Sequence, residues 1–422
     1  MKILFLTPQL PYPPRQGTTI RNYNLIRLLA QEHQIHLFTF LASGEQYSQE
    51  SHLAALCERI VTADQPARSL ARRGLDTLAS NRPDMGLRLA SPVAHARLAA
   101  LLAEETYDLV QVEGIEMASY GLAATAIQPR ARLIFDDHNV EYLLQKRSAL
   151  VDLRRPLRWP AALYSLIQWN KLHRYERMIC SRADAVIAVS EPDRSALVQF
   201  VPDGLVDVVP NGIDLSEYPL ARPVQNTDEQ PTLVFTGKMD YRPNVDAILW
   251  FVGEVLPLIQ ARQPDVRLQV VGMSPHRRLA ALRGSPGVEI TGAVADVRPY
   301  VYAAAVYVVP LRVGGGTRFK VLEALASGKP IVSTSLGVEG LGLQDGRELL
   351  LADEPQHFAQ AVLRLLDDQA RNGLLAGTLS QALSSAGRHF VEAHFTWEQI
   401  VPRLEQVYQA VMRMEPLASR QR

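Results

Sequence analysis

A glycine-rich turn near residue 315 carries the residue types best suited to hold a diphosphate. It combines three consecutive glycines with a hydroxyl, two cations and a carboxylate: Gly314, Gly315, Gly316, Thr317, Arg318, Lys320 and Glu323. Unobstructed backbone N–H groups at the positive end of a helix bind anions. Arg318 and Lys320 add positive charge, and the Glu323 carboxylate could chelate the two hydroxyls of a ribose.

Segment 135–141 is a second candidate site, because polar side chains crowd directly behind an apolar run. It holds Asp136, Asp137, His138 and Glu141. Carboxylates and an imidazole at a strand end suit acid–base catalysis, and they suit the binding of sugar hydroxyls equally well. A structural histidine is the third interpretation, and the sequence leaves all three open.

Two further glycine-containing loops are candidates for binding a phosphate or another anion. Gly237 and Lys238 follow an apolar run; the glycine permits close backbone approach, and the lysine is a point charge suited to phosphate. Gly17 ends a loop rich in Pro and Gly, ahead of a helical pattern whose N-terminus favours anions. A rigid structural connection is the alternative for this second loop.

Short apolar runs that alternate with helical patterns must position these residues. The runs are mostly continuous and β-branched, which is typical of parallel sheets covered on both faces by helices. They lie at residues 3–7, 35–40, 109–112, 133–136, 185–190, 206–209, 232–236, 268–271, 288–290, 306–310, 330–333 and 348–351. Helical patterns at 245–261, 317–326 and 357–366 supply crossovers. We predict an α/β protein with two doubly wound, Rossmann-like domains, which bind ligands beyond the carboxyl ends of their strands.

The length of 422 residues also favours two domains, because single cores seldom grow beyond about 250–300 residues. A polar stretch with three prolines, residues 218–231, is typical of a linker. We predict one domain at 1–212, joined by a C-terminal helix within 395–422, and a second at 213–394.

Composition and missing motifs exclude several classes of function. Lys plus Arg and Asp plus Glu both number 44, so the net charge is zero and nucleic-acid binding is not supported. No apolar stretch reaches about 18 residues, so no membrane-spanning helix is expected. Asp-x-Asp, His-Glu-x-x-His and Gly-x-Ser-x-Gly are absent, and no Gly-x-Gly-x-x-Gly follows the first strand. These absences argue against a metal-held diphosphate, a metalloprotease, a hydrolase and a dinucleotide oxidoreductase.

The first apolar run and the cysteines predict a cytoplasmic location. Residues 3–6 are too short for the core of a signal peptide. Cys57 and Cys180, the two cysteines, lie far apart in the chain and fit a reducing compartment.

Segment 142–182 carries nine basic residues against two acidic ones, a local net charge of +7, interleaved with Trp and Tyr. This pattern suits peripheral contact with an anionic surface at the inner face of a membrane. A solvated helical face with acidic partners elsewhere in the fold is the other interpretation. Segment 68–97, with six Arg against two Asp, is similar but weaker.

Three motifs together resemble glycosyltransferase family four. They are Val-Pro-Asn-Gly-Ile-Asp at 209–214, Phe-Thr-Gly-Lys at 235–238 and Phe-Lys-Val-Leu-Glu-Ala-Leu-Ala-Ser-Gly-Lys-Pro-Ile-Val-Ser-Thr at 319–334. The resemblance implies a GT-B fold, with two Rossmann-like domains facing across a cleft and a last helix that crosses back to the first. It also implies metal-independent, retaining transfer of a sugar from a nucleotide diphosphate sugar to a glycan or lipid-linked acceptor.

The resemblance also implies roles by position. Glu323 matches the second member of the family's glutamate pair, which binds the ribose. Lys238 stands where the family often has Arg at the donor phosphates, and His138 matches a histidine near the reacting sugar. We therefore expect His138, Lys238 and Arg318 to act in catalysis. The expected binding residues are Gly17, Gly237, Gly314, Gly315, Gly316, Thr317, Lys320 and Glu323, and no metal or other cofactor is expected.

Two positions depart from the family pattern. Gly315 stands where the first glutamate of the pair would fall, and no cation stands near Pro243, where the family has a lysine. We expect Arg318 and Lys320 to supply the missing charge. Two alternatives stay open: a nucleotide-sugar epimerase or hydrolase with the same fold, and an inactive scaffold subunit that binds nucleotide sugar.

Overall fold

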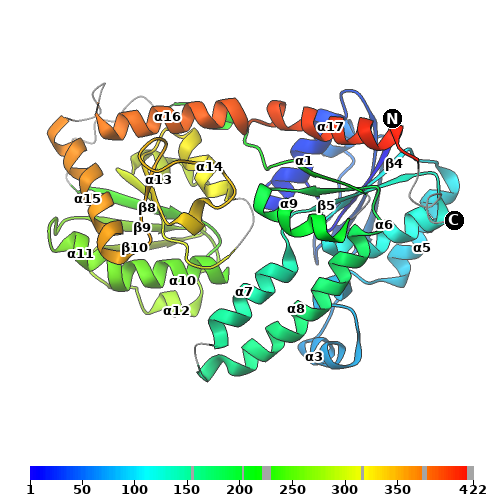
Figure 1. Ribbon diagram of the computed structural model, residues 1–422, viewed down its shortest axis with the longest axis horizontal. Helices are drawn as coiled ribbons and strands as arrows, with labels where there is room; N and C mark the ends of the chain where they lie inside the picture. The colour runs from blue at the N-terminus through cyan, green and yellow to red at the C-terminus, as the bar shows by residue number, and fades with distance from the viewer. Residues whose placement is uncertain (154–155, 202–203, 221–229, 315–317, 373–377, 416–422) are drawn as a thin grey trace. The chain divides into compact units, whose positions relative to one another are not determined.

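The computed structural model describes residues 1–153, 156–201, 204–220, 230–314, 318–372 and 378–415. The chain divides into two compact units (Figure 1). Unit 1 comprises Met1–Asn211 and Trp397–Arg422, and unit 2 comprises Gly212–Thr396. Each unit has its own parallel sheet, so each is described separately.

The sheet of unit 1 has seven strands in the order β3-β2-β1-β4-β5-β6-β7, all parallel. The strands are β1 (Lys2–Thr7), β2 (Gln34–Leu41), β3 (Arg59–Asp64), β4 (Leu109–Glu113), β5 (Arg132–Asp137), β6 (Ala185–Ala188) and β7 (Leu205–Val208). The strand order reverses between β1 and β4. Ligands bind beyond the carboxyl ends of strands at such a reversal.

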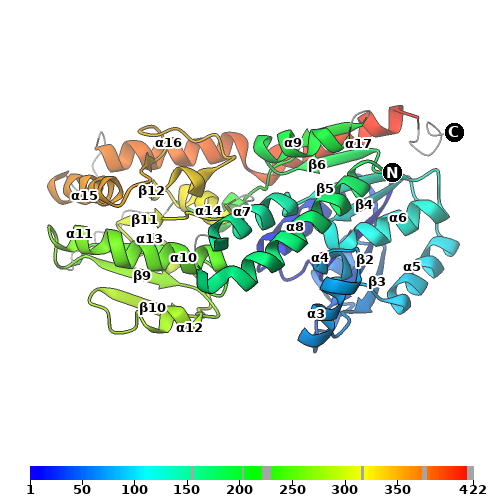
Figure 2. The same ribbon diagram turned by 60° about the horizontal axis from the view of Figure 1, so that its bottom comes forward.

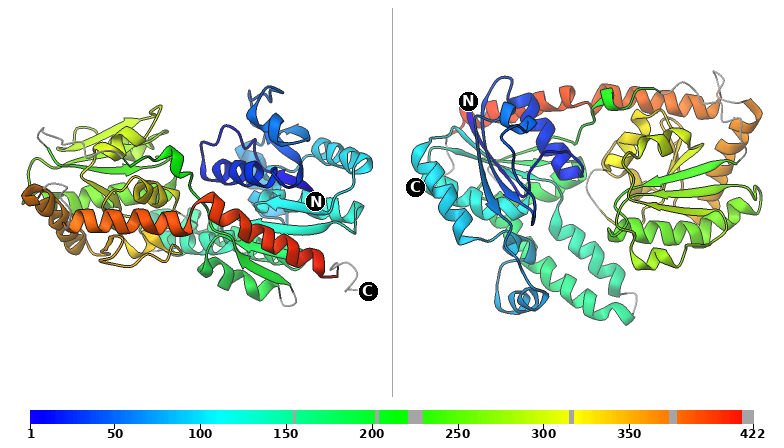
Figure 3. Two further views of the ribbon diagram at one scale, coloured as in Figure 1. Left: turned by 90° about the horizontal axis from the view of Figure 1, so that it is seen from above. Right: turned by 180° about the vertical axis from the view of Figure 1, so that it is seen from behind.

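The helices of unit 1 connect these strands and cover the sheet. They are α1 (Gly17–Leu29), α2 (His52–Leu56), α3 (Leu70–Ala79), α4 (Asp84–Arg88), α5 (Pro92–Glu104), α6 (Ala118–Ile127), α7 (Glu141–Leu153), α8 (Trp159–Cys180), α9 (Glu191–Leu197) and α17 (Trp397–Arg413). Although α17 is last in sequence, it lies beside α1 (Figure 3). It buries an apolar stripe that includes Trp397, Leu404 and Tyr408, and the Tyr408 hydroxyl donates to Gln111 Oε1 on β4 at 3.2 Å.

The sheet of unit 2 has six parallel strands in the order β10-β9-β8-β11-β12-β13 (Figure 2). They are β8 (Thr232–Thr236), β9 (Arg267–Val271), β10 (Val288–Gly292), β11 (Val306–Val309), β12 (Ile331–Ser333) and β13 (Leu350–Leu351). Its helices are α10 (Arg242–Trp250), α11 (Leu256–Gln260), α12 (Arg277–Ala280), α13 (Arg298–Ala303), α14 (Phe319–Ala326), α15 (Pro355–Asn372) and α16 (Leu379–His394). The order reverses between β8 and β11, so the loops after these two strands are the favoured ligand positions.

The predicted α/β class and the return of the last helix to the first domain are confirmed. Each predicted apolar run overlaps a strand, because a central parallel strand is buried on both faces and must be apolar throughout. Strand β3 was missed, since it lies at the sheet edge, is mostly half-buried and mixes charged with apolar residues. Most of the predicted linker, residues 221–229, and part of the predicted glycine turn, residues 315–317, lie outside the described residues.

The helical pattern predicted at 245–261 is confirmed, because the chain is helical from Arg242 to Gln260. Within this run a π segment, Phe251–Val255, lies between α10 and α11. Pro257 explains the π segment, because proline has no N–H to donate to the preceding turn and its ring crowds the carbonyl there.

Gly121 sets how closely α6 approaches the sheet of unit 1. A Cβ at this position would lie 2.4 Å from Val112 Cγ2 and 3.1 Å from Leu133 Cδ1. Gly121→Ala should therefore lower the free energy of unfolding by about 1–3 kcal/mol, measured by urea denaturation. Gly74→Ala in α3 is the matched control, because nothing lies within 4 Å of its Cβ; it should be neutral or stabilise by up to about 1 kcal/mol. Equal losses of stability in Gly121→Ala and Gly74→Ala would contradict this account.

Candidate functional site

His138 lies beyond the carboxyl end of β5, and a buried carboxylate orients it. Its Nε2 is 2.7 Å from Oε2 of Glu113, the fully buried last residue of β4. Gln111 donates to the other Glu113 oxygen at 3.0 Å. Although burial alone would lower the pKa of His138, the hydrogen bond to Glu113 and the charge of Asp136 outweigh it and raise that pKa. The imidazole is thereby held in one orientation.

Asp136 does not belong to the open site, because Arg21 of α1 holds it in the interior. Arg21 donates from Nε at 3.0 Å and from Nη2 at 2.7 Å to Asp136 Oδ2, and both side chains are almost completely buried. Nη1 of Arg21 donates to Pro210 O at 3.0 Å and to Asn211 Oδ1 at 3.1 Å. Burial raises the pKa of Asp136 to about 6, Arg21 opposes that rise, and Glu113 adds to it.

Asp137 is likewise turned into the interior, where it meets Glu176 of α8. Burial raises the pKa of both carboxyl groups well above their usual range, and a hydrogen bond between them requires one proton. The Glu176 oxygens accept from the backbone N–H groups of Glu141 and Tyr142 at 2.7 and 2.8 Å. A side chain of α8 therefore caps the N-terminus of α7.

Residues of this segment, the buried Asp137 included, line a pocket of about 350 Å³ in unit 1. Its lining is rich in side-chain amides and carboxyls: Pro8, Gln9, Gln16, Thr18, Gln65, Met85, Arg88, Leu89, Gly114, Ile115, Glu116, Asp137, His138, Asn139 and Glu141. The neighbours of Gly17 are among them, so the predicted Gly17 loop and His138 meet at one pocket. Arg88 is 3.0 Å from Glu116, and burial raises the pKa of Glu141 to about 8. A pocket of this kind suits a neutral ligand with many hydroxyls.

Glu113, Asp136 and His138 each offer a ligand atom, and these atoms lie within 4.8 Å of one another. The residues do not fit a metal ion, however. Arg21 already matches the charge of Asp136, and the proton shared between His138 Nε2 and Glu113 occupies the nitrogen that a cation would need.

In unit 2, the ammonium group of Lys320 lies at the turn after β8. Nζ donates to Asn244 Oδ1 at 2.8 Å and lies 3.9 Å from the centre of the Phe235 ring. A Cβ at Gly237 would be 3.0 Å from the same ammonium, and Gly237 has a φ of +145°, which other residues rarely adopt. Burial and then the neighbouring Arg318 lower the pKa of Lys320 to about 7.

The other predicted donor residues surround this ammonium or lie near it. Arg318 is buried, and a Cβ at Gly314 would be 3.5 Å from its Nη1. Glu323 Oε1 accepts from the Tyr218 hydroxyl at 3.1 Å, and burial raises the pKa of Glu323. Lys238 is more exposed, with Nζ 3.6 Å from Asp240 Oδ2. Gly315, Gly316 and Thr317 fall outside the described residues.

Sequence reasoning missed Glu113, Arg21, Asn244 and Tyr218. Glu113 directly follows the predicted run at 109–112 and precedes a glycine, so the sequence did contain a signal for it. The partners of Arg21 and Lys320 lie 115 and 76 residues away, and no local pattern predicts such pairs.

The fold corresponds to that of solved structures of other proteins. A sucrose-phosphate synthase from Thermosynechococcus elongatus has a TM-score of 0.68 at 20% identity, over 97% of this chain and 99% of that one. Anabaena HepE in complex with UDP-glucose has a TM-score of 0.65 at 16% identity, over 97% and 100%. Two parallel α/β units with this strand order and a returning last helix define a GT-B fold.

The family follows from the sequence matches. Residues 15–217 match Glycosyltransferase Family 4, and residues 230–368 match Glycosyl transferases group 1. The chain belongs to the family-4 type of glycosyltransferases, as its motifs predicted. A GDP-mannose-dependent alpha-(1-6)-phosphatidylinositol monomannoside mannosyltransferase from Mycobacterium tuberculosis is 29% identical over 251 residues. That alignment covers 54% of this chain and 62% of the relative, so the chain spans less than two thirds of the relative's length.

Removal of the Arg21 guanidinium should leave a buried carboxylate without its partner. Arg21→Met should lower the free energy of unfolding by about 3–5 kcal/mol, and the double variant Arg21→Met with Asp136→Leu should recover much of that loss. Denaturant unfolding measures both effects. If the free-energy losses of the two single variants simply added in the double variant, the coupling inferred from the 2.7 Å contact would be wrong.

Proposed function

We propose that this chain transfers a sugar from a nucleotide diphosphate sugar to a glycan or lipid-linked acceptor, with retention of anomeric configuration and without a metal ion. The family and the donors named for HepE and the mannosyltransferase, UDP-glucose and GDP-mannose, support the donor class. The phosphatidylinositol acceptor named for the mannosyltransferase supports a lipid-linked acceptor.

One observation carries the proposal: Lys320 holds a buried ammonium beside Gly237, with the Arg318 guanidinium close enough to lower its pKa. Two neighbouring buried cations repel each other; Glu323 offsets part of the charge at Lys320, and a further anion would offset more of it. A diphosphate would bring that anion. Gly237 and Gly314 have no side chain to block its approach.

The same two cations support a reaction without metal. When the anomeric C–O bond breaks, the bonding electrons leave with the diphosphate, and preorganised positive charge stabilises that leaving group. A divalent metal ion performs this task in other enzymes. Lys238, at the start of the same turn, is assigned to the outer phosphate oxygens, and the Glu323 carboxylate to the ribose hydroxyls.

The pocket of unit 1 is assigned to the acceptor, with His138 at the transferred sugar. Its amides and its Arg88–Glu116 pair suit hydroxyl groups. The acceptor hydroxyl attacks the anomeric carbon from the face that the diphosphate leaves, and its proton passes to the departing phosphate oxygen. Retention follows without a covalent enzyme intermediate. An epimerase or hydrolase would turn over the donor without acceptor, and an inactive scaffold would bind nucleotide only.

None of the helices in the described part of the chain is long and apolar enough to cross a bilayer. We propose a cytoplasmic protein that contacts the anionic inner face of a membrane through segment 142–182. The charge of that segment and the lipid acceptor of the mannosyltransferase support this contact.

Diphosphate binding should be linked to protonation of Lys320. In the free protein its pKa is about 7, and a bound anion raises that pKa. Binding therefore takes up a proton above pH 7, so the affinity for the nucleoside diphosphate should fall as pH rises from 7 to 9. Titration calorimetry in buffers of different ionisation enthalpy measures the proton uptake. Lys320→Met should abolish the uptake and raise Kd about tenfold or more, since hydrogen bonds to charged groups contribute about 1.5–3 kcal/mol.

Lys329→Met is the matched control for that variant. Lys329 is also a buried lysine of unit 2, with a pKa lowered to about 8 by burial, but it donates to the carbonyls of Tyr302 and Ala304. Its loss should lower stability and leave nucleotide affinity unchanged. Equal weakening of binding in both variants, or undiminished proton uptake in Lys320→Met, would refute the diphosphate site.

Turnover should not depend on a divalent ion, because Lys320 and Arg318 supply the positive charge. We expect equal rates with a chelator and with added magnesium, and a product whose anomeric configuration, read by NMR, equals that of the donor. A rate abolished by the chelator and restored by magnesium would contradict metal independence, and an inverted product would contradict retention.

A further inference from the structure

Helix α3 of unit 1 turns its apolar side to solvent. Leu70, Leu75 and Leu78 are 82%, 58% and 81% exposed, and no residue of this helix is buried. The half-buried positions are Arg73, Asp76 and Thr77, all polar. An amphipathic helix on a globular domain normally has the opposite orientation.

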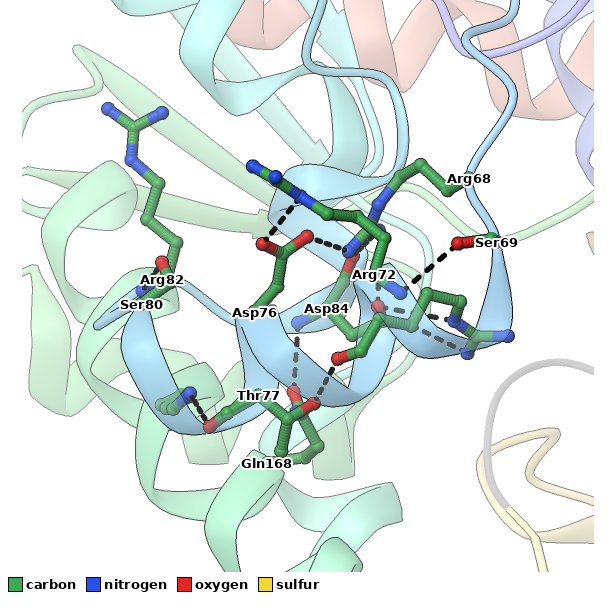
Figure 4. A network of polar contacts seen from close by, with 11 residues as sticks. Arg68, Ser69, Arg72, Asp76, Thr77, Ser80, Arg82, Asp84 and Gln168 are labelled. Atoms are coloured by element: carbon green, nitrogen blue, oxygen red, sulfur yellow. Dashed lines mark hydrogen bonds and ion pairs between the residues drawn. The ribbon is translucent and has the colours of Figure 1, made fainter.

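A polar network holds the helix in this orientation (Figure 4). Arg73 donates to Asp84 Oδ2 at 2.7 Å, and Arg68 lies 2.9 Å from Asp76 and 3.1 Å from Asp84. Lys171 of α8 also donates to the Thr77 carbonyl. These bonds fix the polar side inward, so the exposure of the leucines is built into the fold.

Two of the exposed leucines, Leu70 and Leu78, border an apolar groove between α3 and α8, which lie side by side (Figures 1 and 2). The groove has a volume of about 460 Å³ and is lined by Leu70, Arg73, Gly74, Thr77, Leu78, Pro160, Leu163, Tyr164 and Ile167. Leu163 and the neighbouring Trp159, at the start of α8, are 60% and 59% exposed. Contiguous exposed apolar surface of this kind marks an interaction site.

A basic pocket of about 420 Å³ adjoins the groove along α8. Four cations and no carboxylate are among its lining residues, which are Asn81, Arg82, Ser119, Leu122, Lys171, Arg174, Tyr175, Met178 and Arg182. Within the described residues, Arg82, Arg174 and Arg182 take part in no ion pair. The contact between Lys171 and Thr77 joins the two pockets, since each lines one of them.

We propose that α3 and α8 form the surface by which this protein docks on an anionic phospholipid bilayer. The basic pocket takes the phosphate of an anionic lipid, while Leu70, Leu78 and Trp159 enter the boundary between headgroups and acyl chains. Trp and Tyr favour that boundary, and cations favour its negative surface.

The apolar groove and the basic pocket together favour a bilayer, rather than a second copy of the chain, as the binding partner. A second copy would have to present an acidic patch for the basic pocket beside an apolar strip for the groove, whereas anionic lipid supplies both chemistries everywhere on its surface. The inference deepens the proposed membrane contact. It adds α3, which lies outside segment 142–182, as the apolar anchor.

The test is co-sedimentation of the full chain with phosphatidylcholine vesicles that contain or lack phosphatidylglycerol. Wild type should bind the anionic vesicles, less so at high salt, and should not bind phosphatidylcholine alone. Leu70→Glu with Leu78→Glu should abolish binding. In the double variant Arg174→Gln with Arg182→Gln, the loss of each cation should lower the partition coefficient of the protein onto anionic vesicles about fivefold.

Matched controls carry the same changes elsewhere on unit 1. Val93→Glu with Ile127→Glu alters exposed apolar residues of α5 and α6, and Arg130→Gln with Arg403→Gln removes two exposed cations. Both controls should bind like wild type. Equal losses in control and test variants, or no binding of wild type to anionic vesicles, would overturn the proposal. So would a dimer, seen by sedimentation velocity without lipid, that Leu70→Glu with Leu78→Glu dissociates.

Fluorescence of Trp159 gives a second readout that does not depend on activity. Of the four tryptophans, this one is exposed, whereas Trp250 and Trp397 are buried and Trp169 is half-buried. Anionic vesicles should shift its emission to the blue, and Trp159→Phe should remove the shift. An unchanged spectrum in wild type would count against docking. Nucleotide affinity should be unaltered in the docking variants, so failure here and failure of the proposed transferase function are distinguishable.

Discussion

The buried ion pair between Arg21 and Asp136 is the constraint on which unit 1 depends. The Arg21 guanidinium, carried by α1, donates hydrogen bonds to Asp136 at the end of β5. It also donates to Pro210 and Asn211, where unit 1 gives way to unit 2. Burying both charges has a large desolvation cost that excellent geometry must offset. Because the pair fixes the end of β5, it fixes the next two residues as well, and with them the orientation of His138 toward Glu113.

The two units bury titratable groups of opposite charge. Unit 1 gathers carboxyl groups at the ends of β4 and β5, and burial raises the pKa of Asp136, Asp137 and Glu141. Unit 2 buries cations at the ends of β8 and β11, and the pKa of Lys320 falls. The first environment suits neutral hydroxylated ligands, and the second suits an anion. The proposed function makes use of this division, since it assigns the acceptor sugar to unit 1 and the nucleotide diphosphate to unit 2.

The outward apolar side of α3 has the same origin as the sites, because buried charge pairing takes precedence over apolar burial. Asp84 is almost completely buried and needs Arg68 and Arg73, both at the N-terminal part of α3 or just before it. Satisfying that carboxylate turns the leucines of the helix to solvent. An interface with lipid would remove the resulting cost of exposed apolar surface.

The sequence by itself determined the α/β class, nearly every strand and the glycine turns, because these follow from local period, β-branching and residue size. It also placed His138 beyond a strand end and Lys320 near a helix start, where ligands bind, and Glu323 further along the same helix. Only the tertiary structure decided which charges meet. Asp136 and His138 are two residues apart, yet one faces Arg21 in the interior and the other a pocket. Lys320 reaches Asn244 across 76 residues. Such pairings depend on burial and strand order, which neighbouring residues do not encode.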